Sequence, residues 1–451
     1  MTFNEHDIIV APATATGGAI AVIRVSGEGA VECCDSVFRG RTALSEAKPY
    51  TVHYGEIVDG DRVVDDVLVT IFRAPHSYTG EDGVEISVHG SAYIVSEVLS
   101  LLVHHGARMA EPGEFSVRAF LAGKMDLSQA EAVADMIASS SRASHSLAST
   151  QMRGGYSSSL ADLRARLLNV ASLLELELDF SEEEVEFADR TQLAVMLGDA
   201  AAEISRLKES FRLGNAIKEG VATVIVGEPN VGKSTLLNRL VGEERAMTSD
   251  IAGTTRDTIE AMCNIDGVMF RFVDTAGLRD TDDRLEKMGI DRTRRALEQA
   301  QIVVQMTDAG SGGVVETLEL RDDQTLIRVM NKIDRFTEEE KRHLVDGEDV
   351  VAISAKSGYG VEELRRRLRS VIDTDGVYAG ETVVSNGRHY EALCRAMDAL
   401  RHAQKALGEG LSGELLSEEL REVLHHLGEI TGEVTSQDIL NNIFSKFCIG
   451  K

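Results

Sequence analysis

The sequence lacks tryptophan altogether, has only five prolines in 451 residues, and contains only 5% aromatic residues. Its cores must therefore be mainly aliphatic, which the hydrophobic content of 43% allows. The cysteines number five and form no CxxC pair, so we expect no disulfide framework and a reducing compartment. No signal-peptide pattern opens the chain, and no apolar run approaches the roughly 18 residues of a membrane span. We therefore expect a soluble cytoplasmic protein.

Positive charge is also scarce. Lysine and arginine total 47 against 74 acidic residues, which gives a formal net charge of −27. A protein that binds nucleic acid mainly by neutralising phosphates needs a dense basic surface, and this excess of acid opposes that over the molecule as a whole. The composition is still compatible with a local basic patch. A high net charge of this kind typically keeps a protein soluble.

The hydrophobic pattern changes along the chain and predicts several domains, as the length also does. Short β-like runs with glycine turns favour an α+β domain, and two helical stretches flank a region of alternating strands and helices. Such alternation indicates a mainly parallel sheet covered by helices. We interpret the helical stretches as one domain interrupted by an inserted α/β domain. The expected segments are 1–120 (α+β), 121–217 (helical), 218–375 (inserted α/β) and 376–451 (helical).

Residues 227–234 read GEPNVGKS and match the phosphate-loop pattern G-x-x-x-x-G-K-[ST]. A β-branched run precedes the loop and a helical pattern follows it. Gly227 and Gly232 allow the backbone to curl so that its N–H groups face phosphate oxygens. Lys233 would contact the β and γ phosphates, and the Ser234 hydroxyl would bind Mg²⁺.

Three further motifs follow in the order of a guanine nucleotide-binding domain, each at the end of an expected strand. They read DTAG at 274–277, NKID at 331–334 and SAK at 354–356. The carboxylate of Asp334 can accept hydrogen bonds from guanine N1–H and N2–H₂, a donor pair that adenine lacks. The Ala355 N–H could donate to guanine O6. Ligands bind at this edge of such sheets.

The position after Gly277 is Leu278, where Ras-like GTPases carry the glutamine that orients water. Hydrolysis is therefore either negligible or assisted by another group. The segment 254–257 is similar to a switch I, and Thr255 is the expected second Mg²⁺ ligand.

Two patterns look like sites but are better explained otherwise. Residues 408–413 fit GxGxxG, but they follow a helical pattern, so we expect a loop between helices. The pairs His104–His105 and His425–His426 show no further ligand spacing, and we interpret them as solvent positions of helices and not as zinc ligands.

These motifs together resemble the bacterial tRNA modification GTPases of the MnmE/TrmE type. The similarity extends to SDIAGTTRD at 249–257, DTAGLRD at 274–280, the C-terminal FCIGK at 447–451, and RVSG, SYTGED and GKMDLSQAEA near the N-terminus. The resemblance implies a multidomain fold of α+β and α/β type. It consists of an N-terminal α+β folate-binding domain and an all-α domain interrupted by an inserted Ras-like P-loop GTPase domain.

The resemblance implies a GTPase activated by K⁺ and by dimerisation of the G domains, with Glu286 orienting the water. A K⁺ near the phosphates supplies charge stabilisation that an arginine would otherwise give. The implied K⁺ ligands are Asn230, Ser249, Ile251 and Thr254, and the Mg²⁺ ligands are Ser234 and Thr255. The expected GTP-binding residues are Asn230, Val231, Gly232, Lys233, Ser234, Thr235, Ser249, Asp250, Ile251, Ala252, Gly253, Thr254, Thr255, Asp274, Thr275, Ala276, Gly277, Asn331, Lys332, Asp334, Ser354, Ala355 and Lys356.

The resemblance also implies that the N-terminal domain dimerises and binds 5-formyl-tetrahydrofolate or a related folate. The matching positions are Arg24, Glu81, Lys124 and Lys451, and Cys448 is a candidate for the modification chemistry. The implied assembly is a homodimer that joins a FAD-dependent partner of the MnmG/GidA type in a heterotetramer. Together they would add an aminomethyl or carboxymethylaminomethyl group to C5 of the wobble uridine, position 34, of certain tRNAs.

Two other functions remain open at this point. One is a ribosome-assembly GTPase, although such proteins usually carry a KH-type RNA-binding module after the G domain. The other is a folate-binding protein that GTP regulates and that does not act on tRNA. The wobble modification of tRNA in cells without the gene distinguishes both from the main interpretation.

Overall fold

A computed structural model of the chain describes residues 7–179, 190–242, 261–273, 295–311, 318–337, 340, 350–445, 447 and 450. The chain divides into two compact units, one of residues 1–134 with 424–451 and one of residues 135–423. The combination of sheets and long helices confirms the predicted fold class. The predicted boundaries at 120, 217 and 375 stay a prediction. None of the described helices is long and apolar enough to cross a membrane.

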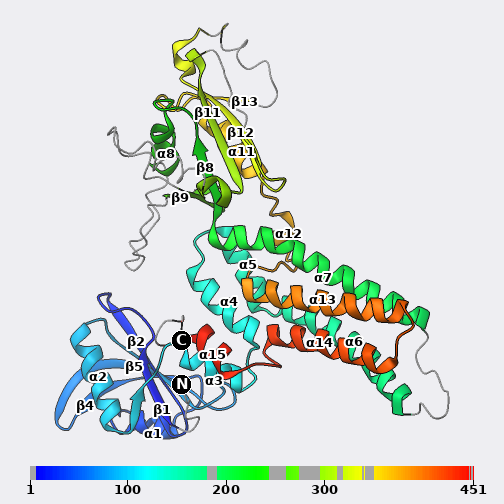
Figure 1. Cartoon of the computed structure of the whole chain (residues 1–451). Coiled ribbons are helices and arrows are strands. Elements are labelled where there is room, and N and C mark those ends of the chain that lie inside the picture. Colours follow the sequence, from blue (N-terminus) through cyan, green and yellow to red (C-terminus); the bar gives the residue numbers. More distant parts are fainter. Residues whose placement is uncertain are drawn as a thin grey trace. The chain divides into compact units, whose positions relative to one another are not determined.

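The first unit is built on a seven-stranded sheet of order β3-β4-β5-β6-β2-β1-β7 (Figure 1), in which β1 and β7 are parallel and the other neighbours antiparallel. Glycine turns separate the strands, which are β1 (Ile8–Pro12), β2 (Ile20–Ser26), β3 (Phe38–Gly40), β4 (Val52–Asp59), β5 (Arg62–Phe72), β6 (Gly83–His89) and β7 (Ala107–Met109). The helical elements of the sheet domain are α1 (Ala30–Asp35), η1 (Leu44–Glu46), α2 (Ala92–His104) and α3 (Glu114–Leu121).

Alternation of side chains along the strands gives this sheet two different faces. Inward residues such as Ile23, Val69 and Ile86 pack with α1 and α2 in an aliphatic core. On the other face, Ile9 and Phe115 form a smaller cluster that joins β1 to α3. The sheet therefore buries one face broadly and the other only near α3.

The C-terminal segment of the same unit packs on α3. Its last helix, α15 (Gln437–Phe444), contacts α3, and Phe444 shares an apolar cluster with Leu127 of α4 (Leu127–Ala138). Gly113 has φ of 73°, and a Cβ there would lie 2.6 Å from the Phe444 carbonyl oxygen, so only glycine allows this close approach. The described end of this segment, Gly450, lies beside the sheet of the same unit, where its carbonyl accepts from Arg24.

The second unit combines long helices with a second sheet. The helices α6 (Gly155–Asp179), α7 (Arg190–Glu219) and α13 (Gly387–Gly408) lie alongside one another (Figure 1). Leucines at helical spacing, including Leu160, Leu163 and Leu167, are buried, as the periodicity predicts. The structure also describes the helices α5 (Arg142–Met152) and α12 (Asp375–Tyr378) of this unit, and α14 (Gly413–Thr431), which spans both units.

The six-stranded sheet has the order β13-β12-β11-β8-β10-β9, parallel except for the β9–β10 hairpin. Its strand β8 is buried at every position, and apolar clusters cover both faces. This is the mainly parallel sheet that the alternating pattern predicts. Its elements are β8 (Val221–Val226), α8 (Lys233–Gly242), β9 (Ala261–Ile265), β10 (Val268–Phe272), β11 (Ile302–Asp308), η4 (Ala309–Ser311), β12 (Thr325–Asn331), η5 (Ile333–Arg335), β13 (Val350–Ala352) and α11 (Val361–Ser370).

The turn of the β9–β10 hairpin meets the start of α5. The Ala143 N–H donates to the Gly267 carbonyl at 3.0 Å, and the Arg142 guanidinium lies 4.9 Å from the ring centroid of Tyr378. The hairpin is thus attached to the helical part of the same unit.

Candidate functional site

The predicted phosphate loop lies between β8 and α8, at the carboxyl end of the sheet. Gly227 has φ of 148°, and a Cβ there would lie 2.2 Å from the Met306 carbonyl oxygen. Gly232 has φ of 104°, and a Cβ there would lie 2.3 Å from Nδ2 of Asn331. Both positions require glycine, because any side chain would meet atoms of the neighbouring strands. Asn230 adds a third left-handed residue, with φ of 62°.

The half-buried Lys233 is held by this loop. Its Nζ donates to the carbonyl oxygens of Gly227 at 2.7 Å and Glu228 at 2.8 Å. Burial lowers the pKa of Lys233, since removal from water disfavours the charged form. Among the described residues, no carboxylate lies within ion-pair distance of it. The ammonium therefore stands where a polyphosphate can supply the missing negative charge.

Asn331, at the end of β12, links two loops through its side chain. Its Nδ2 donates to the Val231 carbonyl at 2.6 Å, and its Oδ1 accepts the Ala355 N–H at 2.9 Å. The side chain is 2% exposed, so both hydrogen bonds are shielded from water. Because Val231 belongs to the phosphate loop and Ala355 to the SAK motif, Asn331 fixes the phosphate-binding and base-binding loops relative to each other.

The predicted base-reading residues lie next to this junction. Lys332 has φ of 68°, which ends β12, and its Nζ lies 2.6 Å from Oδ2 of Asp308. Asp334 is exposed, and a hydrogen bond from the Ser354 side chain holds the pKa of its carboxyl below the ordinary value. Asp334 is thus kept in the ionised form that the predicted contact with guanine requires.

Two residues that position the loops of this site lie outside the sequence motifs. Arg239 of α8 donates from Nε to the Ala355 carbonyl at 2.9 Å and from Nη2 to the Lys356 carbonyl at 2.7 Å. Asp308 neutralises Lys332 from β11. Sequence reasoning missed both, because each acts across separate elements and neither lies in a recognisable pattern.

The structure therefore brings one part of the predicted nucleotide site together at the carboxyl edge of the sheet. These residues are Asn230, Val231, Gly232, Lys233, Ser234, Thr235, Asn331, Lys332, Asp334, Ser354, Ala355 and Lys356. The other predicted positions lie outside the described residues, and their roles stay predictions. They are Ser249, Asp250, Ile251, Ala252, Gly253, Thr254, Thr255, Asp274, Thr275, Ala276, Gly277 and Glu286.

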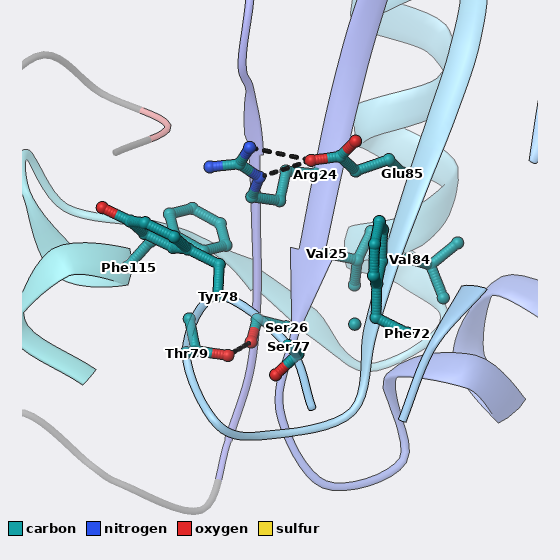
Figure 2. Close-up of a pocket in the computed structure, with 11 residues that line it drawn as sticks. Arg24, Val25, Ser26, Phe72, Ser77, Tyr78, Thr79, Val84, Glu85 and Phe115 are labelled. Atoms are coloured by element: carbon teal, nitrogen blue, oxygen red, sulfur yellow. Dashed lines mark hydrogen bonds and ion pairs between the residues drawn. The ribbon is translucent and has the colours of Figure 1, made fainter. Parts of the chain in front are cut away.

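The first unit contains a cavity of about 150 Å³ between β2, β6 and α3 (Figure 2). Aromatic rings of Phe72, Tyr78 and Phe115 form much of its wall. Arg24 lines it and donates from Nε and Nη2 to Glu85 Oε1 at 3.0 and 2.7 Å. The Arg24 guanidinium also lies 5.3 Å from the Tyr78 ring centroid and 5.8 Å from that of Phe115. The cavity thus combines flat apolar walls with a charged pair.

Two other predicted folate positions lie around this cavity. Ser26, which lines it, donates to Oε2 of Glu81 at 2.8 Å. Lys124 hydrogen-bonds the Pro75 carbonyl, and its Cε would lie 3.2 Å from a Cβ at Gly80. Arg24 is the only one of the three that lines the cavity itself. The remaining predicted positions, Lys451 and Cys448, lie outside the described residues, although the Gly450 carbonyl accepts from Arg24 Nη1 at 3.3 Å.

A network of buried charges supports Glu81. Arg118, whose side chain is 3% exposed, donates to Glu81 at 3.1 Å, to Asp7 at 2.6 Å and to Glu114 at 3.3 Å. Burial raises the pKa of Glu114, but the hydrogen bond from Arg108 and the charges of both arginines outweigh it, so this pKa lies below the ordinary value. The pKa of Asp7 is lowered in the same way. The carboxylates of Asp7 and Glu114 are therefore ionised, and each is paired with an arginine.

Comparisons with known proteins agree with this arrangement. A family model described as the GTP-binding protein TrmE N-terminus matches residues 8–124, and one described as the MnmE helical domain matches residues 127–448. The tRNA modification GTPase MnmE of Bacteroides fragilis is 50% identical over 466 residues, covering 99% of this chain and all of that protein. The protein of the same name from Christiangramia forsetii is 47% identical over 471 residues, covering 99% of each chain.

Among solved structures, the G domain of the T. maritima FeoB iron transporter is 25% identical, covers 34% of this chain and 99% of that one, and has a TM-score of 0.23. The two family models together account for almost the whole chain, and the curated relatives match it from end to end. The chain therefore belongs to the MnmE family of tRNA modification GTPases.

Proposed function

We propose that this protein is a K⁺-activated GTPase that hydrolyses GTP to GDP and phosphate in the modification of tRNA. With a FAD-dependent partner of the MnmG/GidA type, it would add an aminomethyl or carboxymethylaminomethyl group to C5 of the wobble uridine. A formyl- or methylene-tetrahydrofolate would supply the one-carbon unit. The observation that carries the GTPase assignment is the junction at Asn331, which joins the phosphate loop to the guanine-reading loops.

Guanine selectivity follows from the charge state of Asp334. An ionised carboxylate accepts hydrogen bonds from guanine N1–H and N2–H₂, and adenine would leave it without these donors. The hydrogen bond from Ser354 favours this ionised form. Arg239 supports the geometry by holding the carbonyls of Ala355 and Lys356.

The residues of the phosphate loop suit the two proposed metal ions. Ser234 stands at the beginning of α8 and offers a hydroxyl oxygen, a hard ligand of the kind that Mg²⁺ prefers. The amide oxygen of Asn230 is a neutral donor suited to K⁺, whose positive charge would stabilise the developing negative charge on the phosphates. We propose that Thr255 completes the Mg²⁺ ligands and that Ser249, Ile251 and Thr254 complete those of K⁺.

The water that attacks GTP needs an orienting group, because Leu278 stands where Ras-like GTPases have glutamine. We propose that Glu286 orients this water through its carboxylate. Its substitution by alanine should lower kcat and leave nucleotide affinity near the wild-type value.

The cavity of the first unit is the proposed folate site. The rings of Phe72, Tyr78 and Phe115 offer the flat surfaces that a pterin ring can pack against, and Arg24 offers a cation to its carboxylates. Glu81, Lys124 and Lys451 would contribute polar contacts around this cavity, and Cys448 remains a candidate for the modification chemistry. Arg24→Ala should weaken binding of 5-formyl-tetrahydrofolate about tenfold or more, measured by calorimetry, with GTP hydrolysis unchanged.

An exposed apolar face supports the proposed homodimer. Tyr54 of β4 and Leu68 of β5 face each other across the strands and are 68% and 47% exposed, and neighbouring Val52 is 59% exposed. Exposed apolar side chains that cluster on one sheet face are typical of protein interfaces. The same face of a second copy is the proposed partner, and the FAD-dependent protein would complete a heterotetramer in the cytoplasm.

The decisive experiment compares GTP hydrolysis by the full chain in K⁺ and Na⁺ at equal ionic strength, with and without the FAD-dependent partner and tRNA. We expect fast turnover in K⁺ and slow turnover in Na⁺, and equal rates would overturn the role of K⁺. Deletion of the gene should leave the wobble uridine unmodified, and the wild-type gene but not Lys233→Ala should restore it. Fully modified tRNA in the deletion strain would overturn the role in tRNA modification.

A further inference from the structure

Near the C-terminal end of α14, three side chains that can bind a metal ion converge on the surface. They are His425, His426 and Glu429, and one ligand atom from each lies within 4.8 Å of the other two. Nε2 of His425 is 3.5 Å from Oε1 of Glu429, and Nδ1 of His426 is 3.4 Å from Oε2 of the same carboxylate. None of the three belongs to the nucleotide or folate sites proposed above.

Helix geometry explains why they converge. Successive residues of an α-helix are rotated by about 100°, so His425 and His426 point in directions about 100° apart. Glu429 follows His425 by four residues, which places it about 40° round the helix and one turn further along. Its carboxylate therefore lies between the two imidazoles and contacts both. The rings approach edge to face, with centroids 5.4 Å apart.

The distances are those expected between ligand atoms of one metal ion, and without metal the His426 and Glu429 side chains are joined by a long hydrogen bond. Two ligand atoms bound to one zinc ion at about 2.1 Å in tetrahedral geometry are about 3.4 Å apart, since that is the edge of the tetrahedron. The two imidazole–carboxylate distances of 3.5 and 3.4 Å have this length. They are longer than the usual 2.7–3.2 Å of a nitrogen–oxygen hydrogen bond.

We propose that His425, His426 and Glu429 bind a divalent transition metal ion of the Zn²⁺, Co²⁺ or Ni²⁺ class. Two imidazole nitrogens and the Glu429 carboxylate, which presents a different oxygen to each imidazole, form a ligand set that these ions favour over Mg²⁺ or Ca²⁺. The side chains of His426 and Glu429 are both 16% exposed and that of His425 is 48% exposed, so an ion can enter from solvent. Three protein ligands leave the fourth tetrahedral position to water or an external ligand.

The chain provides its own control in the other histidine pair. His104 and His105 are also adjacent at the end of a helix, but each Nδ1 contacts a carbonyl of its own helix, those of Ser100 and Leu101. The positions three and four residues after His104 are Ala107 and Arg108, which offer no carboxylate. The sequence interpretation treated both pairs alike, since it did not include the glutamate one turn after His425.

The test is a titration of the metal-free, nucleotide-free full chain with Zn²⁺ against a chromophoric chelator, together with Co²⁺ absorption spectra. His425→Ala/His426→Ala should lose one equivalent of bound Zn²⁺ and the visible bands of the Co²⁺ complex. Glu429→Gln, which preserves size, should weaken binding at least about tenfold. His104→Ala/His105→Ala should match the wild type in stoichiometry and affinity.

Thermal unfolding separates a lost ligand from a lost fold. Unfolding without metal gives each variant its own baseline, since the side chains of His426 and Glu429 are only 16% exposed and their substitution also removes packing. Zn²⁺ should raise the unfolding temperature of the wild type and the His104/His105 control but not that of His425→Ala/His426→Ala. Equal Zn²⁺ stoichiometry and affinity in the wild type and the His425/His426 variant would overturn the proposal, and would leave ordinary surface histidine–glutamate pairs.

Discussion

Arg118 of the N-terminal unit and Lys233 of the phosphate loop are both cations removed from water, but they have different partners. Arg118 donates to the carboxylates of Asp7, Glu81 and Glu114. Lys233 donates to two backbone carbonyls, and its pKa is lowered by burial. The first cation is neutralised by the protein itself, whereas the second obtains full compensation only from an anionic ligand.

This difference separates a charge that stabilises the fold from a charge that binds a ligand. A buried ion pair has already exchanged its hydration for contacts within the protein, so its loss is felt in folding. A cation held only by carbonyl dipoles is destabilising before the ligand arrives and favourable afterwards. The same substitution should therefore have opposite consequences in the two regions, and the predictions below test this contrast.

The largest effect on folding is expected for Arg118→Ala. It leaves Glu114, which is fully buried, without one of its cations, and loss of one partner of a buried pair costs about 3–5 kcal/mol. The measurement is hydrogen exchange of β1 and α3 in the full chain, with protection expected to fall by that free energy. Arg62→Ala is the matched control, because Arg62 is 50% exposed in its pair with Glu97 and solvent-exposed ion pairs contribute little to stability. Equal losses of hydrogen-exchange protection in Arg118→Ala and Arg62→Ala would contradict the proposed role of Arg118 in the fold.

Lys233→Ala should do the reverse. Nucleotide affinity should fall at least about a hundredfold, because a charge-assisted contact to phosphate is lost. The nucleotide-free protein should be as stable as the wild type or slightly more stable, since the variant no longer carries a cation whose pKa burial has lowered. Titration with a fluorescent GTP analogue measures the first effect and thermal unfolding without nucleotide the second. A large loss of stability without nucleotide would show that Lys233 supports the fold.

The same contrast explains what the sequence could reveal. The phosphate loop was predictable because its glycines, lysine and serine are contiguous between a strand and a helix, so the motif contains the whole local geometry. The cavity around Arg24 could not be predicted in this way. Phe115 and Glu85 reach it from other elements, and the chain brings them together only when the sheet folds. The family resemblance implied roles for Arg24, Glu81 and Lys124, but it did not show that, of these three, only Arg24 lines the cavity.

The ends of some strands could not be predicted from the sequence either. The expected strand at the NKID motif ends at Asn331, because Lys332 adopts a left-handed conformation that starts a short 3₁₀ turn. The expected strand at the SAK motif ends earlier, at Ala352, and the motif lies in the loop that follows. Apolar runs predicted that these strands exist, whereas their ends depend on hydrogen bonds to distant residues, such as the bond from Ala355 to Asn331.

A smaller loss of stability is expected for Asn331→Ala, because this substitution removes hydrogen bonds between loops and leaves the charges unchanged. The substitution removes two shielded hydrogen bonds and leaves the Val231 carbonyl and the Ala355 N–H without these partners. We expect a loss of about 2–3 kcal/mol in the unfolding free energy of the second unit, with weaker GTP binding. Asn331→Asp keeps the acceptor for Ala355 but sets a buried carboxylate against the Val231 carbonyl, so denaturant unfolding should show it at least as destabilised as the alanine variant. Wild-type stability in both variants would contradict the proposed junction.

The smallest effect concerns mild acid, and it probes the paired charges without a substitution. The pKa values of Asp7 and Glu114 lie below their ordinary values of 3.8 and 4.5, so the folded state favours ionised carboxylates more than the unfolded state does. Their contribution to stability is therefore complete above about pH 4.5 and is lost as the pH falls through the lowered folded-state values. Hydrogen exchange stepped from pH 6 to pH 3, corrected for the intrinsic rate, should show protection of β1 and α3 declining in this window. The decline should be shallower in Arg118→Ala, because the lowering of both pKa values depends partly on Arg118. An identical decline in the wild type and the variant would mean that these carboxylates do not link the stability of the N-terminal unit to pH.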